Sequence, residues 1–269
     1  MQPRARAVQQ VTQNNRGKKT PGVDGKTALT TKERLILCQS LNKHWYRWRH
    51  KPLRRVNIPK PDGRVRGIGI PTIADRAWQC LLKYAAEPAY EAIAGERSYG
   101  FRPGRSAQDA QKLIFSNLNG RANGKDKLVL ETDISKCFDE IDHQAMLSKV
   151  VLPKEGLKGL RKAVKVGVKG KYPSSERGTP QGGVISPLLA NIALDGFENL
   201  GNDQYSRKKF GSSGNGIKGI RYADDAIFIC KPGADIQKLR HDIVDILPTP
   251  LSLKVGSPAR LMNFLMLEG

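Results

Sequence analysis

Cysteine and histidine are scarce in this sequence, and neither is spaced as a metal-binding or disulfide-bonded protein would require. The four cysteines form no CxxC pair, and the four histidines form no cluster with ligand spacing. This pattern argues against a zinc site and against a disulfide framework. We therefore expect buried, reduced thiols at Cys38, Cys80, Cys137 and Cys230.

Long apolar stretches are also missing. No run of eighteen apolar residues occurs, and the first 19 residues contain no apolar core of a signal peptide. Hydrophobic residues still make up 39% of the 269 residues, which is enough for one large domain or two small ones with a real core. We expect a globular, non-secreted, cytoplasmic protein with no membrane partner.

Acidic residues are few compared with basic ones, and the imbalance is concentrated near the N-terminus. Against 46 lysines and arginines there are 25 aspartates and glutamates, which gives a net charge of +21. Residues 1–66 hold 17 of the basic residues and three of the acidic ones, so +14 of the net charge lies in this quarter of the chain. A field of this sign suits a polyanion.

Within that quarter, the stretch HWYRWRHKPLRR interleaves aromatic and basic side chains. Such a stretch can stack on nucleobases while its cations neutralise phosphates; a basic amphipathic face whose aromatics belong to the core is the alternative. A membrane surface would require a longer apolar face. We expect four of its bases to bind nucleic acid, namely Arg47, Arg49, Arg54 and Arg55.

Hydrophobic periodicity and capping residues predict alternating helices and strands. The helices are predicted at residues 30–42, 72–94 with a break at Pro88, 106–120, 143–150 and 184–200. Strands are predicted on both sides of the turn Pro61-Asp62-Gly63 and at residues 126–135, whereas the Lys/Gly-rich residues 153–171 show no clear pattern. Because strands and helices alternate without regular βαβ spacing, we expect an α+β fold.

The stretch GIRYADDAIFIC places Asp224 and Asp225 side by side between two apolar segments that predict a β-hairpin. An Asp-Asp pair in a turn is usually solvated, and a shared cation is the alternative. A second acidic strand end, at Asp133, lies 91 residues before Asp224. Two Mg²⁺ ions for phosphoryl transfer need carboxylates from different strands, because each ion takes one or two carboxylates plus water and substrate phosphate.

Five blocks of sequence occur in a recognisable order: NIPKPDGRVRGIGIPTIADRAWQ, SYGFRPGRSAQDA, DISKCFDEIDH, RGTPQGGVISPLLANIAL and YADD. With them the chain resembles bacterial group II intron reverse transcriptases from about Arg6 to Cys230. The resemblance implies a right-hand polymerase fold, with helical and β fingers, a palm built on an antiparallel sheet, and no thumb before the chain stops at Gly269. Retron, diversity-generating and CRISPR-associated reverse transcriptases are less similar alternatives.

The same resemblance divides the chain into four segments. Residues 1–108 are expected to form the N-terminal extension and fingers, and residues 109–150 the palm with the first acidic strand. Residues 151–182 are expected to return to the fingers. Residues 183–269 are expected to complete the palm with the YADD hairpin and a C-terminal helix.

The resemblance also implies a role for each acidic residue. Asp133 and Asp224 would be the principal ligands of two Mg²⁺ ions, with Asp225 beside them and the carbonyl of Ile134 as a further ligand. Phe138 would stack under the deoxyribose and exclude a 2′-hydroxyl, although simple core packing is the alternative. No side-chain general base would be required.

Other residues are matched to nucleotide and template binding. Lys60 and Arg66 would grip the triphosphate of the incoming nucleotide. Gln181 would read its sugar side. Arg102 and Arg105 would contact the template backbone or form structural ion pairs.

The expected function is RNA-directed DNA polymerisation, in which a dNTP is added to a primer 3′-hydroxyl on an RNA template. The expected partners are RNA template, DNA primer, dNTPs, group II intron RNA, and a separate protein supplying the thumb. A non-catalytic, RNA-binding splicing accessory and an inactive fragment are the alternatives.

Overall fold

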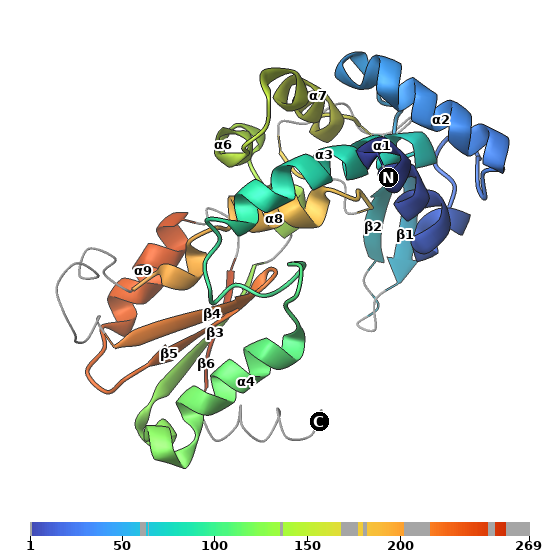
Figure 1. Cartoon of the computed structure of the whole chain (residues 1–269). Helices are drawn as coiled ribbons and strands as arrows, with labels where there is room; N and C mark the ends of the chain where they lie inside the picture. The colour runs from blue at the N-terminus through green and yellow to red at the C-terminus, as the bar shows by residue number, and fades with distance from the viewer. Residues whose placement is uncertain are drawn as a thin grey trace. The chain divides into compact units, whose positions relative to one another are not determined.

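A computed structural model describes residues 2–59, 63, 65–134, 137–167, 177–179, 182–201, 216–246 and 251–256, the last six by their backbone alone (Figure 1). The chain forms two compact units, each made of two segments. Unit 1 comprises Met1–Ala92 and Phe138–Ala193. Unit 2 comprises Ile93–Cys137 and Leu194–Gly269.

The chain passes between the units three times, after Ala92, Cys137 and Ala193. The divisions expected from the sequence followed residues 108, 150 and 182. The prediction and the structure both give four alternating segments, but the structure groups residues 93–108 with unit 2 and residues 138–150 and 183–193 with unit 1. The assignment of these segments to fingers and palm stays a prediction.

Unit 1 is mainly helical and carries one two-stranded sheet. Its helices are α1 (Pro3–Gln9), η1 (Gln10–Asn14), η2 (Arg16–Lys19), α2 (Thr31–His44), η3 (Trp45–Arg47), α3 (Ile73–Glu91), α5 (Cys137–Glu140, beginning at the unit boundary), α6 (His143–Lys149), α7 (Lys154–Val164) and α8 (Ser186–Ala193). Its strands are β1 (Arg54–Pro59) and β2 (Val65–Ile70). In the part of the chain that the structure describes, no helix is both long and apolar enough to cross a bilayer.

The predicted α2 and the predicted hairpin are confirmed. Helix α2 begins with a capping box, in which the Thr30 main-chain N–H donates to Glu33 at 2.8 Å and the Glu33 N–H donates to the Thr30 hydroxyl at 3.3 Å. Strands β1 and β2 pair antiparallel from Arg54↔Ile70 to Pro59↔Val65. Of the turn between them, residues 60–62 and 64 lie outside the described residues.

The predicted break at Pro88 is wrong, because α3 continues through this residue to Glu91. Proline lacks only its own N–H, so the helix forgoes a single bond within its last turn. The carbonyl of Pro88 still accepts a bond from the Ala92 N–H at 3.2 Å. A proline one turn from the end of a helix therefore leaves the helix intact.

Helix α7 was not predicted. Its inward face consists mainly of small residues, with Gly156, Gly159 and Ala163 buried beside Leu160 and Val164. A face of this kind has helical periodicity but gives little hydrophobic signal. Glycine at position 159 has a packing reason, since a Cβ built there would lie 2.6 Å from Cζ2 of Trp78.

Unit 2 is built on a four-stranded antiparallel sheet with the order β4-β5-β3-β6. Its strands are β3 (Leu128–Ile134), β4 (Ile217–Tyr222), β5 (Asp225–Cys230) and β6 (Leu251–Gly256). Its helices are α4 (Ala107–Leu118), η4 (Gly120–Ala122), η5 (Gly124–Asp126), η6 (Phe197–Asn199) and α9 (Ile236–Ile246). The predicted strand at residues 126–135 is confirmed as β3, and the predicted helix at residues 106–120 as α4.

The core of unit 2 lies on both faces of this sheet. Ile114 and Leu118 of α4 pack with Val129, Ile220 and Ile229 on one face, where the sheet is covered by α4. On the opposite face, Phe228 meets Phe197 edge-on, with ring centroids 5.7 Å apart. The sheet is thus buried on both sides along its middle, as the apolar composition of its strands requires.

All four cysteines are reduced thiols, as expected. Cys80, Cys137 and Cys230 are buried, whereas Cys38 on α2 is partly exposed. Burial raises the pKa of the Cys80 and Cys230 thiols.

The glycines of α7 allow a matched test of its packing. A Cβ at position 156 would meet its nearest neighbour at 3.6 Å, whereas one at position 159 would meet Trp78 at 2.6 Å. Gly156→Ala should stabilise the protein by up to about 1 kcal/mol through helix propensity. Gly159→Ala should destabilise it by about 1–2 kcal/mol, because overpacking outweighs the same gain. Denaturant unfolding measures both, and equal effects of the two variants would contradict this packing.

Candidate active site

The Asp224–Asp225 pair lies where β4 and β5 meet. Tyr222 and Asp225 are paired across the two strands, so Ala223 and Asp224 alone form the connection. The predicted hairpin is confirmed, with Asp224 in the turn and Asp225 as the first residue of β5. The two carboxylates are therefore set by a two-residue turn, which fixes the register of the hairpin.

Asp133 is brought to the same end of the sheet. It lies on β3, the neighbour of β5, and its register partner is Asp225. Side chains of directly opposed residues in an antiparallel pair project from the same face, with Cβ atoms about 4.5–5.5 Å apart. The prediction that Asp133 and the acidic hairpin occupy adjacent antiparallel strands is confirmed. Ile134, whose carbonyl was predicted to be a ligand, is the last residue of β3.

The three carboxylates repel one another. Partial desolvation raises the pKa of Asp225, and the charges of Asp224 and Asp133 raise it further. In the described part of the chain, no lysine or arginine forms an ion pair with any of the three. The end of the sheet thus carries a concentration of negative charge, and a bound cation would reduce the repulsion among the carboxylates.

The described residues contain no set of three His, Cys, Asp or Glu side chains close enough to enclose a metal ion. Magnesium does not need such a cage, since it is usually held by one or two carboxylates together with water and substrate phosphates. Asp133 and Asp225 on paired strands, with Asp224 in the adjoining turn, supply that donor type from two directions. The residues present therefore fit Mg²⁺ held jointly with a phosphorylated substrate.

The turn has a strained backbone. Ala223 has a φ of 57°, in the left-handed region that residues other than glycine rarely adopt. Its carbonyl accepts a hydrogen bond from Nη1 of Arg221 at 3.0 Å. Gly100 packs against the turn, because a Cβ there would lie 2.5 Å from the Ala223 nitrogen. The strained conformation is maintained by contacts from both sides.

Arg221 is the centre of this support, although sequence reasoning missed it. It is fully buried, and its Nε donates to Glu198, also fully buried, at 3.1 Å. Its Nη2 donates to the hydroxyl of Ser98 at 2.7 Å. A Cβ at Gly95 would come within van der Waals overlap of the Glu198 carboxylate, so glycine is needed there. One guanidinium therefore ties β4, η6 and the loop before α4 to the acidic turn.

The main chain reinforces the same connection. The Tyr99 N–H donates to the Arg221 carbonyl at 2.9 Å, and the Arg221 N–H donates to the Arg97 carbonyl at 2.9 Å. A signal for Arg221 exists in the sequence, since a lone arginine among apolar residues in GIRYADD requires a buried partner. The sequence does not say which residue that partner is.

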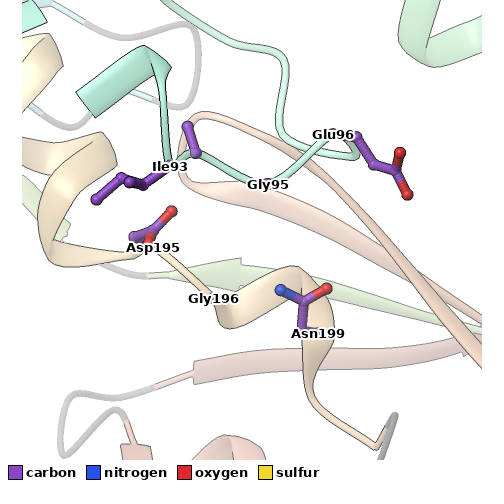
Figure 2. A pocket seen from close by; sticks show the side chains of 7 residues that line it. Ile93, Gly95, Glu96, Asp195, Gly196 and Asn199 are labelled. Carbon is purple, nitrogen blue, oxygen red and sulfur yellow. The ribbon is translucent and has the colours of Figure 1, made fainter. Parts of the chain in front are cut away.

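A pocket of about 430 Å³ lies nearby in unit 2, lined by Ile93, Ala94, Gly95, Glu96, Asp195, Gly196 and Asn199. Figure 2 shows Asp195 and Asn199 projecting toward the segment that carries Ile93 and Gly95, while Glu96 is turned away. The Asn199 side-chain oxygen accepts a bond from Arg97 at 2.7 Å. None of the sequence-predicted site residues lines this pocket.

The other predicted nucleotide-binding residues belong to unit 1. Phe138 is 9% exposed, and its carbonyl accepts a bond from the Thr179 N–H at 2.6 Å. Burial is compatible with sugar contact and with core packing, so its role stays a prediction. Lys60 and Gln181 lie outside the described residues. Arg66 is described by its backbone alone, as part of β2.

The predicted nucleic-acid contacts fall into two groups. Arg102 is 6% exposed and donates to the carbonyls of Gly95 and Ser98, and Arg105 donates to those of Glu96 and Ser98. Both guanidiniums thus bind main-chain carbonyls, which is a structural role other than the expected ion pairs, and their contact with the template backbone stays a prediction. Three of the remaining four, Arg47, Arg49 and Arg55, are exposed, whereas Arg54 is partly buried and donates to the Pro21 carbonyl at 2.8 Å.

Comparison with known families gives two matches. Residues 58–250 match the family described as "Reverse transcriptase (RNA-dependent DNA polymerase)". Residues 1–41 match the family described as "N-terminal domain of reverse transcriptase". Together the two matches cover most of both units.

Curated relatives include bacterial and organellar proteins. Protein YkfC of Escherichia coli is 31% identical over 277 residues, which cover 91% of this chain and 73% of that protein. Maturase-like protein 1 of Euglena gracilis is 29% identical, and the match covers 90% of this chain and 49% of that protein. Group II intron-encoded protein LtrA of Lactococcus lactis is 35% identical, with 67% and 30% covered. The chain thus spans about half of the second relative and under a third of the last.

Two solved structures share the fold. A telomerase from Candida albicans, in complex with a fragment of telomeric RNA, superposes with a TM-score of 0.55 at 12% identity, covering 84% of this chain and 46% of that one. An apo telomerase from Candida tropicalis superposes with a TM-score of 0.51 at 13% identity, covering 77% of this chain and 51% of that one. With the family matches, these likenesses confirm the expected α+β, right-hand fold.

The buried Arg221–Glu198 pair predicts strong coupling. Arg221→Met leaves the Glu198 carboxylate buried without its cation and should destabilise unit 2 by about 3–5 kcal/mol. Glu198→Leu should lower the free energy of unfolding by a similar amount. The double variant should lower it by much less than the sum of the two single-variant effects. A double-mutant cycle of denaturant unfolding measures this coupling. Additive single-variant effects would show that the two side chains act independently.

The repulsion at Asp225 predicts a pH-dependent effect on stability. Because its pKa is raised on folding, ionisation destabilises the folded state, and this loss is complete at neutral pH. Asp225→Asn should therefore raise the free energy of unfolding at neutral pH, by about 0.2–1 kcal/mol if it acts as a cross-strand like-charge pair.

The gain should shrink as the pH falls through the raised folded-state pKa and should be absent below about 4, where the parent carboxyl is protonated in both states. Thermal unfolding between pH 3 and 8 without divalent ions gives the measurement, with Asp126→Asn, an exposed acid of the same unit, as the control. A variant less stable than the parent at neutral pH would mean that Asp225 makes a favourable contact instead.

Proposed function

Because this chain belongs to the reverse transcriptases of the group II intron type, which are RNA-directed DNA polymerases, we propose that it adds dNTPs to a primer 3′-hydroxyl on an RNA template. One observation carries the assignment of the site: Asp133 and Asp225 are register partners on neighbouring strands, directly beside Asp224 in the turn. Carboxylates from two strands are what nucleotidyl transfer with two metal ions requires.

Each acidic residue has a proposed part in this chemistry. Asp133 and Asp224 would hold the ions, Asp225 would add negative charge beside them, and the Ile134 carbonyl would complete the donor set. When bound, two Mg²⁺ ions lower the pKa of the primer hydroxyl and neutralise charge on the leaving pyrophosphate. The raised pKa of Asp225 supports this arrangement, because the carboxylates are poised to gain from a cation.

Arg221 contributes as a positioning residue. Its bonds to Ala223, Glu198 and Ser98 fix the backbone that carries Asp224. A site held in place before substrate arrives loses less energy to reorganisation during the reaction. The buried Arg221–Glu198 pair thus helps to fix the position of the turn in the folded protein.

The incoming nucleotide is assigned to unit 1 residues by resemblance. We assign Lys60 and Arg66 to the triphosphate, Gln181 to the sugar side and Phe138 to the face of the deoxyribose. The partners proposed are RNA template, DNA primer and group II intron RNA, in the cytoplasm, with thumb function supplied by a separate polypeptide where it is needed. The basic first quarter of the chain supports the RNA partners.

A non-catalytic splicing accessory is the second candidate. Its support is the charge of residues 1–66, which suffices for RNA binding without any chemistry. Both candidates bind RNA, so binding alone does not separate them. The acidic cluster does, because only the polymerase uses it.

Asp224→Asn is the deciding variant. The amide keeps the size of the side chain and removes the charge that holds Mg²⁺, so primer extension should fall by at least about 10³-fold while RNA affinity stays within about twofold. Extension on poly(rA)/oligo(dT) with Mg²⁺ and dTTP measures the first, and fluorescence anisotropy with RNA the second. The matched control is Asp126→Asn, which should retain the parent rate.

Two outcomes would count against the proposal. Extension that persists in Asp224→Asn would make the acidic pair an ordinary solvated turn. A parent protein that binds RNA but extends no primer with any divalent ion, even with a thumb-containing polypeptide added, would favour the accessory.

A further inference from the structure

Helix α7 presents a row of cations to solvent. Lys154, Lys158, Arg161 and Lys162 are exposed, and Lys165 at the C-cap is partly exposed. At 100° per residue these five side chains fall within an arc of about 100°, opposite the buried face of small residues. The helix contains one acidic residue, Glu155. A segment without an obvious sequence pattern thus folds into a helix with one basic face.

The four exposed cations of the row form no ion pair in the part of the chain that the structure describes. No carboxylate there forms an ion pair with Lys154, Lys158, Arg161 or Lys162. Like charges on successive helical turns repel by a few tenths of a kcal/mol per pair. The row therefore favours an external polyanion that would neutralise it.

Helix α7 itself contacts the basic stretch already expected to bind nucleic acid. Within unit 1, α7 packs against η3 and α3. The segment after α7 is also tied to the segment before β1, since the Leu53 N–H donates to the Gly167 carbonyl at 3.1 Å. The exposed Arg47 and Arg49 belong to the same part of the unit. Two groups of cations that are distant in the sequence therefore belong to contacting elements of unit 1.

The aromatic residues of that stretch indicate which form of nucleic acid fits. Nε1 of Trp48 donates to Asp75 at 2.9 Å, and the Trp45 carbonyl accepts from Nε1 of Trp78 at 2.7 Å. Tyr46 is 46% exposed but lies under the Arg47 guanidinium, 5.4 Å from its ring centroid. The indole of Trp48 is thus engaged within the fold, whereas the bond at Trp45 involves its main chain alone. Single-strand binding relies on free aromatic faces, whereas duplex RNA is bound through phosphates and shape.

The length of the row agrees with a backbone ligand. From Lys154 to Lys165 it extends about 16 Å at 1.5 Å per residue. A contact of this length extends beyond a single phosphate, so more than one backbone phosphate can lie along the row. A free phosphate group would occupy a small part of it.

We propose that the exposed cations of α7 bind the phosphate backbone of double-stranded RNA. The inference rests on the proposed function in one respect, because membership of a group II intron-type family makes a folded RNA the relevant polyanion. It goes beyond that function by placing an RNA contact on a helix that has no part in the acidic site. Single-stranded RNA, DNA duplex and acidic protein are the competing occupants.

The test removes four charges from α7 with Lys154→Gln, Lys158→Gln, Arg161→Gln and Lys162→Gln together. Glutamine keeps the helix propensity and the polar character of exposed positions. The control removes four exposed charges from unit 2 with Arg121→Gln, Lys125→Gln, Lys231→Gln and Lys238→Gln. Circular dichroism and the melting temperature establish that both variants are folded.

Binding to a blunt RNA hairpin, to poly(rU) and to a DNA duplex of the same length is then measured between 0.05 and 0.3 M salt. For the α7 variant, the log–log salt slope for the hairpin should fall by about 2–4 units, with at least roughly tenfold weaker binding at 0.15 M salt. The slope for poly(rU) should change by less than about one unit. The control variant should keep the parent hairpin slope.

An unchanged hairpin slope in the α7 variant would overturn the proposal. Equal losses for hairpin and poly(rU), equal losses for RNA and DNA duplexes, or equal losses in the two variants would also overturn it. Primer extension by the parent protein is read separately. If the α7 variant binds the hairpin like the parent while the parent extends primers, the RNA-binding proposal for α7 fails and the polymerase assignment holds. If the α7 variant loses hairpin binding but the parent extends no primer, the RNA-binding proposal holds and the polymerase assignment fails.

Discussion

Mutual repulsion of three carboxylates is the constraint on which unit 2 depends. Asp133, Asp224 and Asp225 would separate in a flexible chain, but the antiparallel register of β3 and β5 holds two of them opposite each other. The apolar middle of the same sheet supplies the free energy that keeps the strands paired. A low-stability arrangement at one end is thus maintained by a well-packed core along the strands, as is common at catalytic sites.

Beneath the negative turn lies a buried pair whose charges cancel. Arg221 and Glu198 together contribute little net field, so the positive guanidinium does not neutralise the acidic cluster above it. Its remaining donors are directed at main-chain and hydroxyl oxygens. The protein therefore supports the turn mechanically while leaving its negative charge for a cation. An unpaired arginine in that position would compete with the metal.

The sequence predicted features that depend on local chemistry. Capping residues located α2 and α4, and acidic ends of apolar strands located Asp133 and the hairpin, because these signals need only neighbouring residues. It failed where a distant partner decides the outcome. The glycines of α7 are explained by packing against Trp78, which is distant in the sequence. The role of Arg221 likewise depends on its distant partners Glu198 and Ser98. The role of Trp48 depended in the same way on a distant partner, Asp75.

The interleaving of the two units has a consequence for synthesis on the ribosome. Strand β3 is translated early, but Asp225 follows its register partner Asp133 by 92 residues, and most of the intervening chain belongs to the other unit. At about 5–20 residues per second, β3 waits roughly 5–18 s for β5. During that time its apolar edge is unpaired and open to wrong association. Its assembly is therefore sensitive to translation speed and to chaperones that shield nascent strands.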